Sequence, residues 1–524
     1  MGIRNINYMK GEKKMSHKKM ILIFITICII ITFTGCLNSS PGNVTENPKS
    51  KNIHTFVNVM VGDTNLEEWH ENNVITSVKW QKLRLSDEHS KAYQSLSAAF
   101  DKYNEESLTD AKALMYELTP LAAEMEGEEY NPVYCGAAAE VYLQRADNYI
   151  VSLLESVEKY TGGVHPDYFV NGINYKPDSG EKLLLSDVLT DTKELPSILE
   201  KKITEKYPDV AFSDLKDTFS KYKEDEFTWT IDYQGITFWF SPYEIASFAV
   251  GTLSAKIWFD ENPDMFNKEY IEAPENYVMT LPMRQKLDFD LNENDDKKDC
   301  IEIDTMLDEY GSYNMLSVTV NGKNFTDENS YAYNFDVYLA HLGNKNYIYS
   351  DASSDNDYHM FYTWDINGDT PEIVEELSGT EVDYEWIEEG FEEGTTYKQA
   401  FNNPEFLRLE TRFEILGTRG ATATYKLSET DGKPEMTDKA YTFNYGHDVK
   451  TAIPLDAELL PEMEKTELPI GTSLTPYQTD GKTFVDLKTE NGGIVRLNID
   501  VSDWPRKVNG IPEDECFEEL LYAG

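Results

Sequence analysis

The sequence predicts an α+β N-terminal domain, with helices packed on a mixed antiparallel sheet, followed by an all-β C-terminal domain that is propeller-like or a sandwich. Between residues 93 and 118, apolar residues recur at spacings of three and four, which places them on helical faces. Beyond residue 275, short strand-like stretches are separated by Asn-Gly, Asp-Gly and Gly-Gly steps, a pattern typical of antiparallel strands joined by turns. The 33 Tyr and 24 Phe residues also favour sheet, because aromatic rings pack well on a half-buried pleated surface.

Residues 1–35 have the features of a lipoprotein signal peptide, and residues 36–65 those of a polar tether. Lys18 and Lys19 precede an apolar run that is too short to cross a membrane comfortably. The small residues before Cys36 resemble the lipobox of bacterial lipoproteins. This resemblance implies a lipid on Cys36 that anchors the mature protein to the extracellular face of the cell membrane. An uncleaved signal anchor with an incidental cysteine is the alternative.

The chain is strongly acidic, with a formal net charge of −47. Loss of residues 1–35 would remove six basic residues and one acidic residue, so the mature chain would carry −52. A surface of this charge repels nucleic-acid phosphates, and no nucleic-acid partner is expected. It attracts cations and basic proteins. Plain solubility is the alternative explanation of the same charge.

The first folded domain is expected to span residues 66–268 and to begin with a strand over residues 73–85. Two helices should follow, separated by residues 104–107, and the second should be interrupted near Pro120 because proline removes a backbone donor. Strands are expected over residues 133–160.

The second half of this domain carries a short helix and an aromatic hairpin. Leu195, Leu199 and Ile203 lie on one helical face. Apolar residues alternate along residues 227–240, on both sides of a tight turn at Gln234 and Gly235. This pattern predicts two antiparallel strands with one aromatic-rich face.

Three motifs of this domain form one pattern: YTGGVHP at residues 160–166, DSGEKLLLSDVL at residues 178–189 and SPYEIASFAVG at residues 241–251. In this order they resemble the RsiV/PdaC-type extracellular domain pair, found in lysozyme-sensing anti-sigma factors and in peptidoglycan deacetylases. The resemblance covers the first domain. It implies a module that binds a cell-wall-associated or host-derived ligand, either a lysozyme-like basic protein or wall glycan.

Two parts of those proteins have no counterpart in this sequence. An anchor at Cys36 leaves no cytoplasmic region to bind a sigma factor, and the C-terminal half lacks the Asp and His-x-x-x-His motifs of the deacetylase. The leading interpretation is therefore a non-catalytic surface lipoprotein. His165 is the most tempting base or ligand, but no partner lies at motif spacing from it, and a structural histidine in a turn is favoured.

The second domain, residues 275–524, contains two turns that resemble calcium loops of β-propeller blades. Alternating carboxylate and amide oxygens suit Ca²⁺, which prefers six to eight oxygen ligands. The first turn lacks the usual glycine, and the second lacks a final acidic residue; metal-free turns rich in Asp and Asn are the alternative. The candidate ligands are Asp290, Asn292, Asn294 and Asp299 in the first turn and Asp365, Asn367 and Asp369 in the second.

Cys135, Cys300 and Cys516 are the cysteines beyond the lipobox, and their spacing does not indicate a zinc site. One disulfide, such as Cys300 with Cys516, is possible but not required.

Common catalytic motifs are absent from the sequence, including the G-x-S-x-G elbow, the P-loop, H-E-x-x-H and the dinucleotide fingerprint. The 94 acidic residues contain many carboxylate pairs, but none is singled out. Two alternatives to a binding protein therefore stay open. One is a cell-wall-acting hydrolase that uses a carboxylate pair, and the other is a structural scaffold for surface proteins.

Overall fold

The fold is described from a computed structural model. It describes residues 54–70, 72–125, 135–291, 299–307, 314–327, 332–354, 358–388, 394–444 and 447–523. The predicted signal peptide, Cys36 and most of the tether lie outside these residues. Within the described part of the chain, no helix is both long and apolar enough to cross a membrane.

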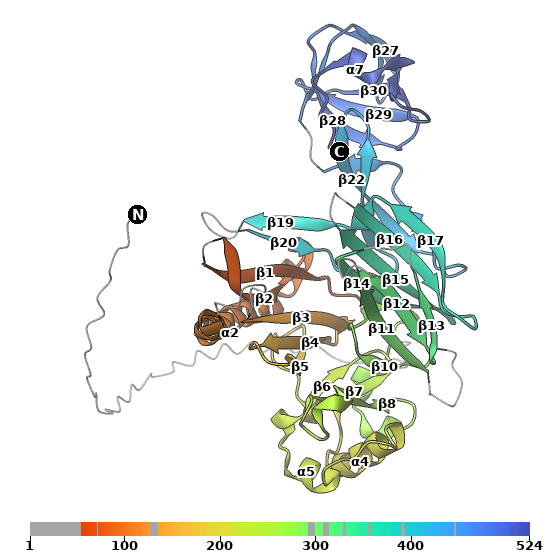
Figure 1. The fold of residues 1–524 in the computed structure, drawn as a ribbon. Coiled ribbons are helices and arrows are strands. Elements are labelled where there is room, and N and C mark those ends of the chain that lie inside the picture. The colour runs from red at the N-terminus through yellow and green to blue at the C-terminus, as the bar shows by residue number, and fades with distance from the viewer. Residues whose placement is uncertain are drawn as a thin grey trace, which may run out of the picture. The chain divides into compact units, whose positions relative to one another are not determined.

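A seven-stranded sheet forms the N-terminal region (Figure 1). Its strand order is β19-β20-β1-β2-β3-β4-β5, and every pairing is antiparallel except that between β2 and β3. The strands are β1 (Val59–His70), β2 (Asn73–Leu85), β3 (Cys135–Ala146), β4 (Val151–Tyr160), β5 (Asp167–Tyr175), β19 (Tyr384–Glu388) and β20 (Gly394–Lys398).

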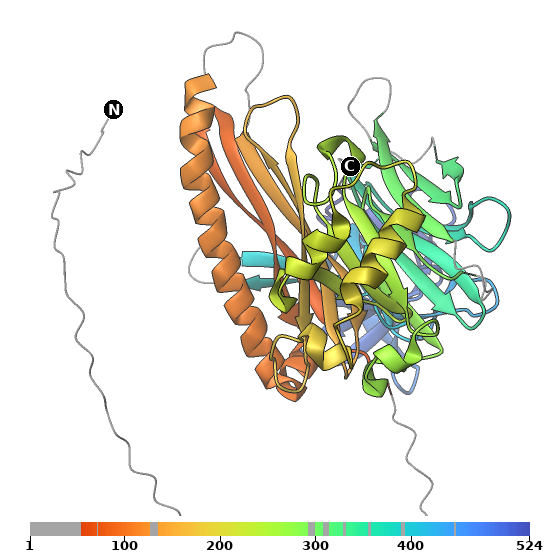
Figure 2. The ribbon, with the colours of Figure 1, turned by 90° about the horizontal axis from the view of Figure 1, so that it is seen from below.

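One long helix covers a face of this sheet. After the short α1 (Asp87–Ala92), α2 (Gln94–Met125) runs for 32 residues without a break (Figure 2). It buries Leu96 and Phe100 against Leu83 of β2 in one hydrophobic cluster. Packing of such an apolar stripe is the main source of helix stability in proteins.

The predicted break of this helix at residues 104–107 is wrong, and Pro120 lies inside the helix. The Asn104 amide donates to the carbonyl of Leu83 at 2.9 Å and accepts from its N–H at 2.8 Å. Asparagine destabilises helices when its side chain competes for nearby backbone groups. Here the side chain is occupied by β2, so the helix continues.

The motif-rich segment after β5 builds a small layer around its own hydrophobic core. The predicted hairpin is confirmed, with Ile231 opposite Ile236, and a third strand completes the sheet. The elements are α3 (Leu185–Val188), α4 (Leu195–Lys206), α5 (Leu215–Lys221), η1 (Glu224–Glu226), β6 (Thr228–Ile231), β7 (Gly235–Phe240), η2 (Phe248–Val250), β8 (Leu253–Trp258), η3 (Pro263–Met265) and α6 (Lys268–Ile271).

Two further sheets share one hydrophobic core, to which Ile303 contributes from one sheet and Trp364 from the other. The four-stranded sheet has the order β10-β11-β12-β13, and the five-stranded sheet has the order β17-β16-β15-β14-β9. The strands are β9 (Asn276–Thr280), β10 (Lys286–Asp288), β11 (Cys300–Leu307), β12 (Asn314–Val320), β13 (Lys323–Thr326), β14 (Asn334–Leu342), β15 (Lys345–Ser354), β16 (Tyr358–Asp365) and β17 (Glu372–Ser378).

The last part of the chain is a fourteen-stranded hydrogen-bonded network, with the main order β18-β21-β22-β24-β28-β29-β30-β26-β27. One of its cores packs against the five-stranded sheet, and a second lies among its later strands. Its elements are β18 (Thr380–Val382), β21 (Leu407–Glu414), β22 (Thr418–Leu427), β23 (Pro434–Met436), β24 (Tyr441–Phe443), β25 (Val449–Thr451), β26 (Leu455–Leu460), β27 (Glu464–Leu468), β28 (Ser473–Thr479), β29 (Phe484–Thr489), β30 (Ile494–Asp500), β31 (Lys507–Val508), β32 (Ile511–Pro512), α7 (Glu513–Cys516) and β33 (Phe517–Glu518).

The molecule is thus mostly sheet, with an α/β N-terminal region and a largely all-β C-terminal part, as the sequence predicts at this level. The propeller-like form is wrong, because the described strands form neither a propeller nor a closed barrel. Short strands joined by turns are equally compatible with blades and with stacked sheets. The four-stranded and five-stranded sheets pack on one shared core, which is the stacked arrangement.

Pairing of β20 with β1 brings residues from the C-terminal half into the N-terminal sheet. Lys398, at the end of β20, forms ion pairs with Asp336 of β14 and, at 2.9 Å, with Asp351 of β15. The seven-stranded and five-stranded sheets are therefore joined by a partly buried lysine as well as by chain connections. The predicted division at residues 268–275 stays a prediction.

Candidate functional site

The first and last of the three motifs meet at the surface. His165, from the turn between β4 and β5, stacks on Phe248 with ring centroids 3.8 Å apart. Tyr243 and Tyr168 approach the same Phe248 ring at 5.4 Å and 6.3 Å. We call these four residues the aromatic platform. Tyr243 is 68% exposed, so the platform presents aromatic surface to solvent.

Polar contacts fix the turn that carries Tyr243. The Ser241 hydroxyl accepts from the N–H of Val170 at 3.2 Å, which ties this turn to β5, the strand that follows the first motif. The Ser241 N–H donates to the Glu244 carboxylate at 2.9 Å, and the Tyr222 hydroxyl donates to it at 3.0 Å. Burial raises the pKa of Glu244. This carboxylate is therefore held as a structural acceptor beneath the platform.

The backbone of Tyr243 is strained, with a φ of 70°. A bulky residue in this region costs about 1–3 kcal/mol and persists where surrounding contacts impose it, often at functional sites. At Tyr243 this strained backbone holds an aromatic ring that is exposed to solvent. His165 uses its Nδ1 toward the Pro166 carbonyl at 3.0 Å, a turn contact that leaves the ring face on Phe248.

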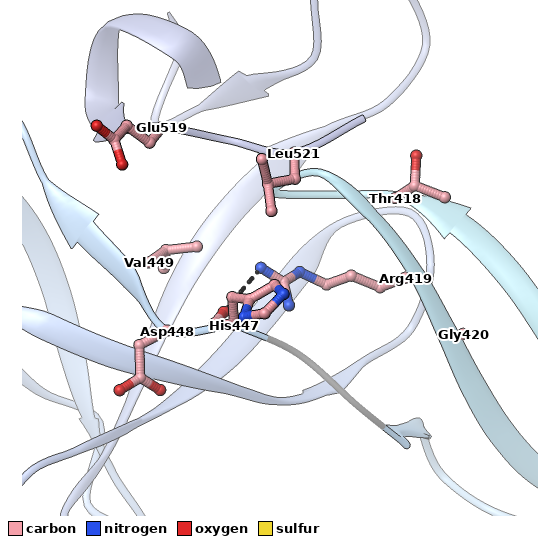
Figure 3. Close-up of a pocket in the computed structure, with 8 residues that line it drawn as sticks. All are labelled: Thr418, Arg419, Gly420, His447, Asp448, Val449, Glu519 and Leu521. Atoms are coloured by element: carbon pink, nitrogen blue, oxygen red, sulfur yellow. Dashed lines mark hydrogen bonds between the residues drawn. The ribbon is translucent and has the colours of Figure 1, made fainter. Parts of the chain in front are cut away.

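A pocket of about 330 Å³ lies in the C-terminal part (Figure 3). Arg419 of β22 is only 8% exposed yet lines this pocket. Its Nε donates to the Leu416 carbonyl at 3.0 Å and its Nη2 to the His447 carbonyl at 3.1 Å. Burial lowers the pKa of this guanidinium. The other lining residues are Thr418, Gly420, His447, Asp448, Val449, Glu519 and Leu521.

A carboxylate pair lies where β18 meets β21. Glu381 is directly opposite Glu410 in the strand register, and the His359 Nδ1 lies 3.2 Å from the Glu381 carboxylate. Asn444 donates to the Glu410 carboxylate at 2.7 Å. Burial, with the nearby charges of Glu381 and Asp383, raises the pKa of Glu410 to about 7.

The candidate calcium residues are spread over two separate turns. Asp299 is buried and accepts from the Leu291 N–H at 3.0 Å and from the Asn321 amide at 2.7 Å. The backbone of Asp290 exchanges two hydrogen bonds with the Gln234 side chain. Asn292 and Asn294 lie outside the described residues, so this turn is seen only at its ends.

In the second turn, the Asp365 carboxylate accepts from the backbone and side chain of Asn367, both at 2.8 Å. Asn367 exchanges two hydrogen bonds with the Asn346 backbone, while Asp369 pairs with Lys323 at 3.2 Å. Among the described residues, no group of three or more His, Cys, Asp or Glu could hold a metal ion. Calcium binding stays a prediction.

The three described cysteines, Cys135, Cys300 and Cys516, are free thiols. Sequence reasoning found the segments of the aromatic platform but not their stacking. It missed Arg419 and the pair of Glu381 and Glu410. No local signal marks these residues, because each gains its role from a strand pairing or from burial.

The fold and these surfaces define a mostly-sheet protein whose N-terminal α/β region presents an aromatic surface. Within that region, residues 184–260 match a family model described as a protein of unknown function, DUF3298. The match includes α3–α5, β6–β8 and the segment that carries Tyr243 and Phe248. No curated protein matches the chain.

Two solved structures of DUF3298 family members resemble part of the chain. One, from Bacteroides fragilis, has 18% sequence identity and a TM-score of 0.30, and the match covers 40% of this chain and 94% of that one. The other, from Pseudomonas aeruginosa, has 14% identity and a TM-score of 0.29, with coverage of 42% and 98%.

Proposed function

We propose that the protein is a non-catalytic, lipid-anchored surface lipoprotein of bacteria. Its RsiV/PdaC-type N-terminal module would bind a lysozyme-like basic protein. The aromatic platform is the observation that carries this proposal. Two motif segments more than 70 residues apart in sequence meet there, and they present stacked, exposed rings in a chain of net charge −47.

Charge and ring chemistry favour the same kind of ligand. A strongly acidic surface accelerates encounter with a basic protein, and added salt screens the attraction. Exposed tyrosine rings also attract lysine and arginine side chains through cation–π contacts. Tyrosine is frequent among the side chains that dominate the energy of protein interfaces.

Wall glycan is the second ligand that the platform supports. Rings such as that of Tyr243 give a flat apolar face of the kind that lines small-molecule sites. A neutral sugar would bind without the salt dependence expected for a basic protein. Salt dependence therefore separates the two ligands.

The test measures binding of the full mature chain to purified lysozyme at about 50 mM and about 200 mM salt, conditions between which screening changes substantially. We expect saturable binding that weakens at the higher salt. Tyr243→Ala should weaken it by about tenfold or more, as for an interface hot spot. Tyr116→Ala is the matched control, because Tyr116 is a tyrosine that is 86% exposed on α2, outside the platform.

Absence of saturable binding at both salt concentrations would overturn the lysozyme proposal. Binding of soluble peptidoglycan fragments that is insensitive to salt and lost in Tyr243→Ala would assign the glycan instead. Equal effects of Tyr243→Ala and Tyr116→Ala on binding would show that the aromatic platform binds neither lysozyme nor glycan.

A carboxylate-pair hydrolase is the second candidate function, and the pair of Glu381 and Glu410 is the observation that favours it. A carboxyl group with a pKa near neutrality suits a general acid. Release of soluble fragments from purified peptidoglycan, abolished in Glu410→Gln, would support the hydrolase. No release from the wild-type protein would reject it.

The lipid anchor is tested separately through Cys36. The proposal expects the wild-type protein to fractionate with membranes and Cys36→Ser to retain the uncleaved signal or to lose its lipid. Incorporation of labelled palmitate into the wild-type protein and not into Cys36→Ser is the measurement. Equal labelling of both proteins contradicts the assignment.

A further inference from the structure

The pocket beside Arg419 contains a desolvated positive charge in a very acidic chain. Arg419 is only 8% exposed as a residue, and only two of its N–H groups donate to described partners, both of them backbone carbonyls. Within the described residues, Arg419 forms no ion pair. A buried charge of this kind is costly unless an opposite charge joins it.

The neighbouring carboxylates are occupied elsewhere. Asp448 accepts from the Thr475 hydroxyl at 2.6 Å and from the Ser473 hydroxyl at 3.4 Å. In Figure 3 the carboxylates of Asp448 and Glu519 point away from the guanidinium. Their charge still lowers the electrostatic potential of the pocket, so they favour an anion of low charge over a dianion.

Glu513, a nearby carboxylate outside the pocket lining, is also occupied by structural hydrogen bonds. Its carboxylate accepts from the Leu416 N–H and from the Tyr522 hydroxyl, both at 2.8 Å. The Leu521 carbonyl accepts from the Thr418 N–H at 2.9 Å, which holds the C-terminal segment against β22. Leu521 remains 62% exposed and lines the pocket together with Val449. The charged centre is therefore flanked by apolar groups.

We infer that this pocket is a binding site for a singly charged carboxylate with a small aliphatic body. The free edge of the Arg419 guanidinium would hold the carboxylate, and Leu521 and Val449 would contact the aliphatic part. Guanidinium and carboxylate match in geometry through paired N–H donors. The volume of about 330 Å³ lies at the lower end of the range for small-molecule sites.

The carboxylate has two chemical sources, a free short-chain acid or the C-terminus of a peptide. Isovalerate represents the first, and N-acetyl-leucine represents the second. Isovaleramide is the neutral isostere of isovalerate, and inorganic phosphate is the dianion control. Binding of each probe to the full mature chain is measured by calorimetry and by ligand-observed NMR.

We expect saturable binding of isovalerate or N-acetyl-leucine. Tighter binding of isovalerate would indicate a free short-chain acid as the ligand, and tighter binding of N-acetyl-leucine would indicate the C-terminus of a peptide. Isovaleramide and phosphate should bind at least about tenfold more weakly, because the first lacks the charge and the second adds repulsion. Arg419→Gln should abolish the binding. Arg84→Gln, a partly exposed arginine paired with Asp87, should leave it unchanged.

Leu521→Glu provides a second variant that does not depend on the stability of a buried substitution. Leu521 is exposed, so the fold should tolerate the change, and the added charge should weaken carboxylate binding by about tenfold or more. The inference is overturned by no saturable binding of either carboxylate, by equal binding of isovaleramide, or by binding that persists in both Arg419→Gln and Leu521→Glu.

Discussion

The Glu410→Gln substitution tests how the strand pairing of β18 with β21 controls a single carboxyl group. Glu410 faces Glu381 across the two strands, accepts a hydrogen bond from Asn444, and lies near Asp383 and His359. Burial and the neighbouring carboxylates raise its pKa from an ordinary value of 4.5 to about 7. The folded state therefore retains a proton that the unfolded chain loses.

The raised pKa of Glu410 determines the direction in which the free energy of unfolding changes with pH. The favourable contribution of protonated Glu410 is fully present below pH 4.5 and is lost as the pH rises through 7. A shift of this size corresponds to about 3 kcal/mol at full weight. Because the side chain is partly exposed, solvent screening reduces the expected effect to about 1–2 kcal/mol.

Glutamine keeps the shape and carries no charge at any pH. We expect Glu410→Gln to match the wild-type free energy of unfolding near pH 5 and to exceed it by about 1–2 kcal/mol near pH 8. Urea unfolding of both proteins at intervals between these values gives the difference curve, from which the other titrating groups cancel. Glu405→Gln, at an exposed position outside this cluster, is the matched control and should give a flat difference. A flat difference curve for Glu410→Gln as well would refute the raised pKa.

Three other outcomes follow from the structure. Gly172→Ala should lower the free energy of unfolding by about 2 kcal/mol or more in urea unfolding, because its Cβ would lie 2.0 Å from the Trp229 carbonyl oxygen; an unchanged value would contradict this close approach. Tyr243→Gly should raise the free energy of unfolding by about 1 kcal/mol by relieving the positive φ, while weakening lysozyme binding; a loss of stability would count against strain at the platform. If the first turn binds calcium, Asp290→Ala and Asp299→Ala should reduce any calcium-dependent rise in melting temperature, and an unchanged rise would exclude this turn.

The hairpin of β6 and β7 shows what local pattern can determine. Alternating apolar residues predict the two strands of this hairpin without help from distant parts of the chain. The register of Ile231 opposite Ile236 places the turn at Tyr233 and Gln234, one residue before the predicted position. Local pattern also predicts the apolar face of α4, where Leu195, Leu199 and Ile203 are all buried. Periodicity of this kind is a property of the local sequence alone.

Helix α2 shows where local pattern fails. The sequence around Asn104 has the features of a helix break, but in the fold its amide is bonded to Leu83 of β2 and no longer competes for the backbone of the helix. Pairing of β20 with β1 is likewise invisible in the sequence, since it joins residues more than 300 positions apart. Such a pairing depends on residues that are distant in the sequence, which local periodicity does not report.

The sequence by itself determined the acidic character of the protein, the mostly-sheet composition with an N-terminal α/β region, and the segments that carry the recognisable motifs. These depend on composition and on short-range periodicity. Only the tertiary structure stacked His165 on Phe248, buried Arg419 beside a pocket, and set Glu381 against Glu410. Each of these sites is made by side chains from segments far apart in the chain, and their chemistry comes from burial and proximity that no single segment specifies.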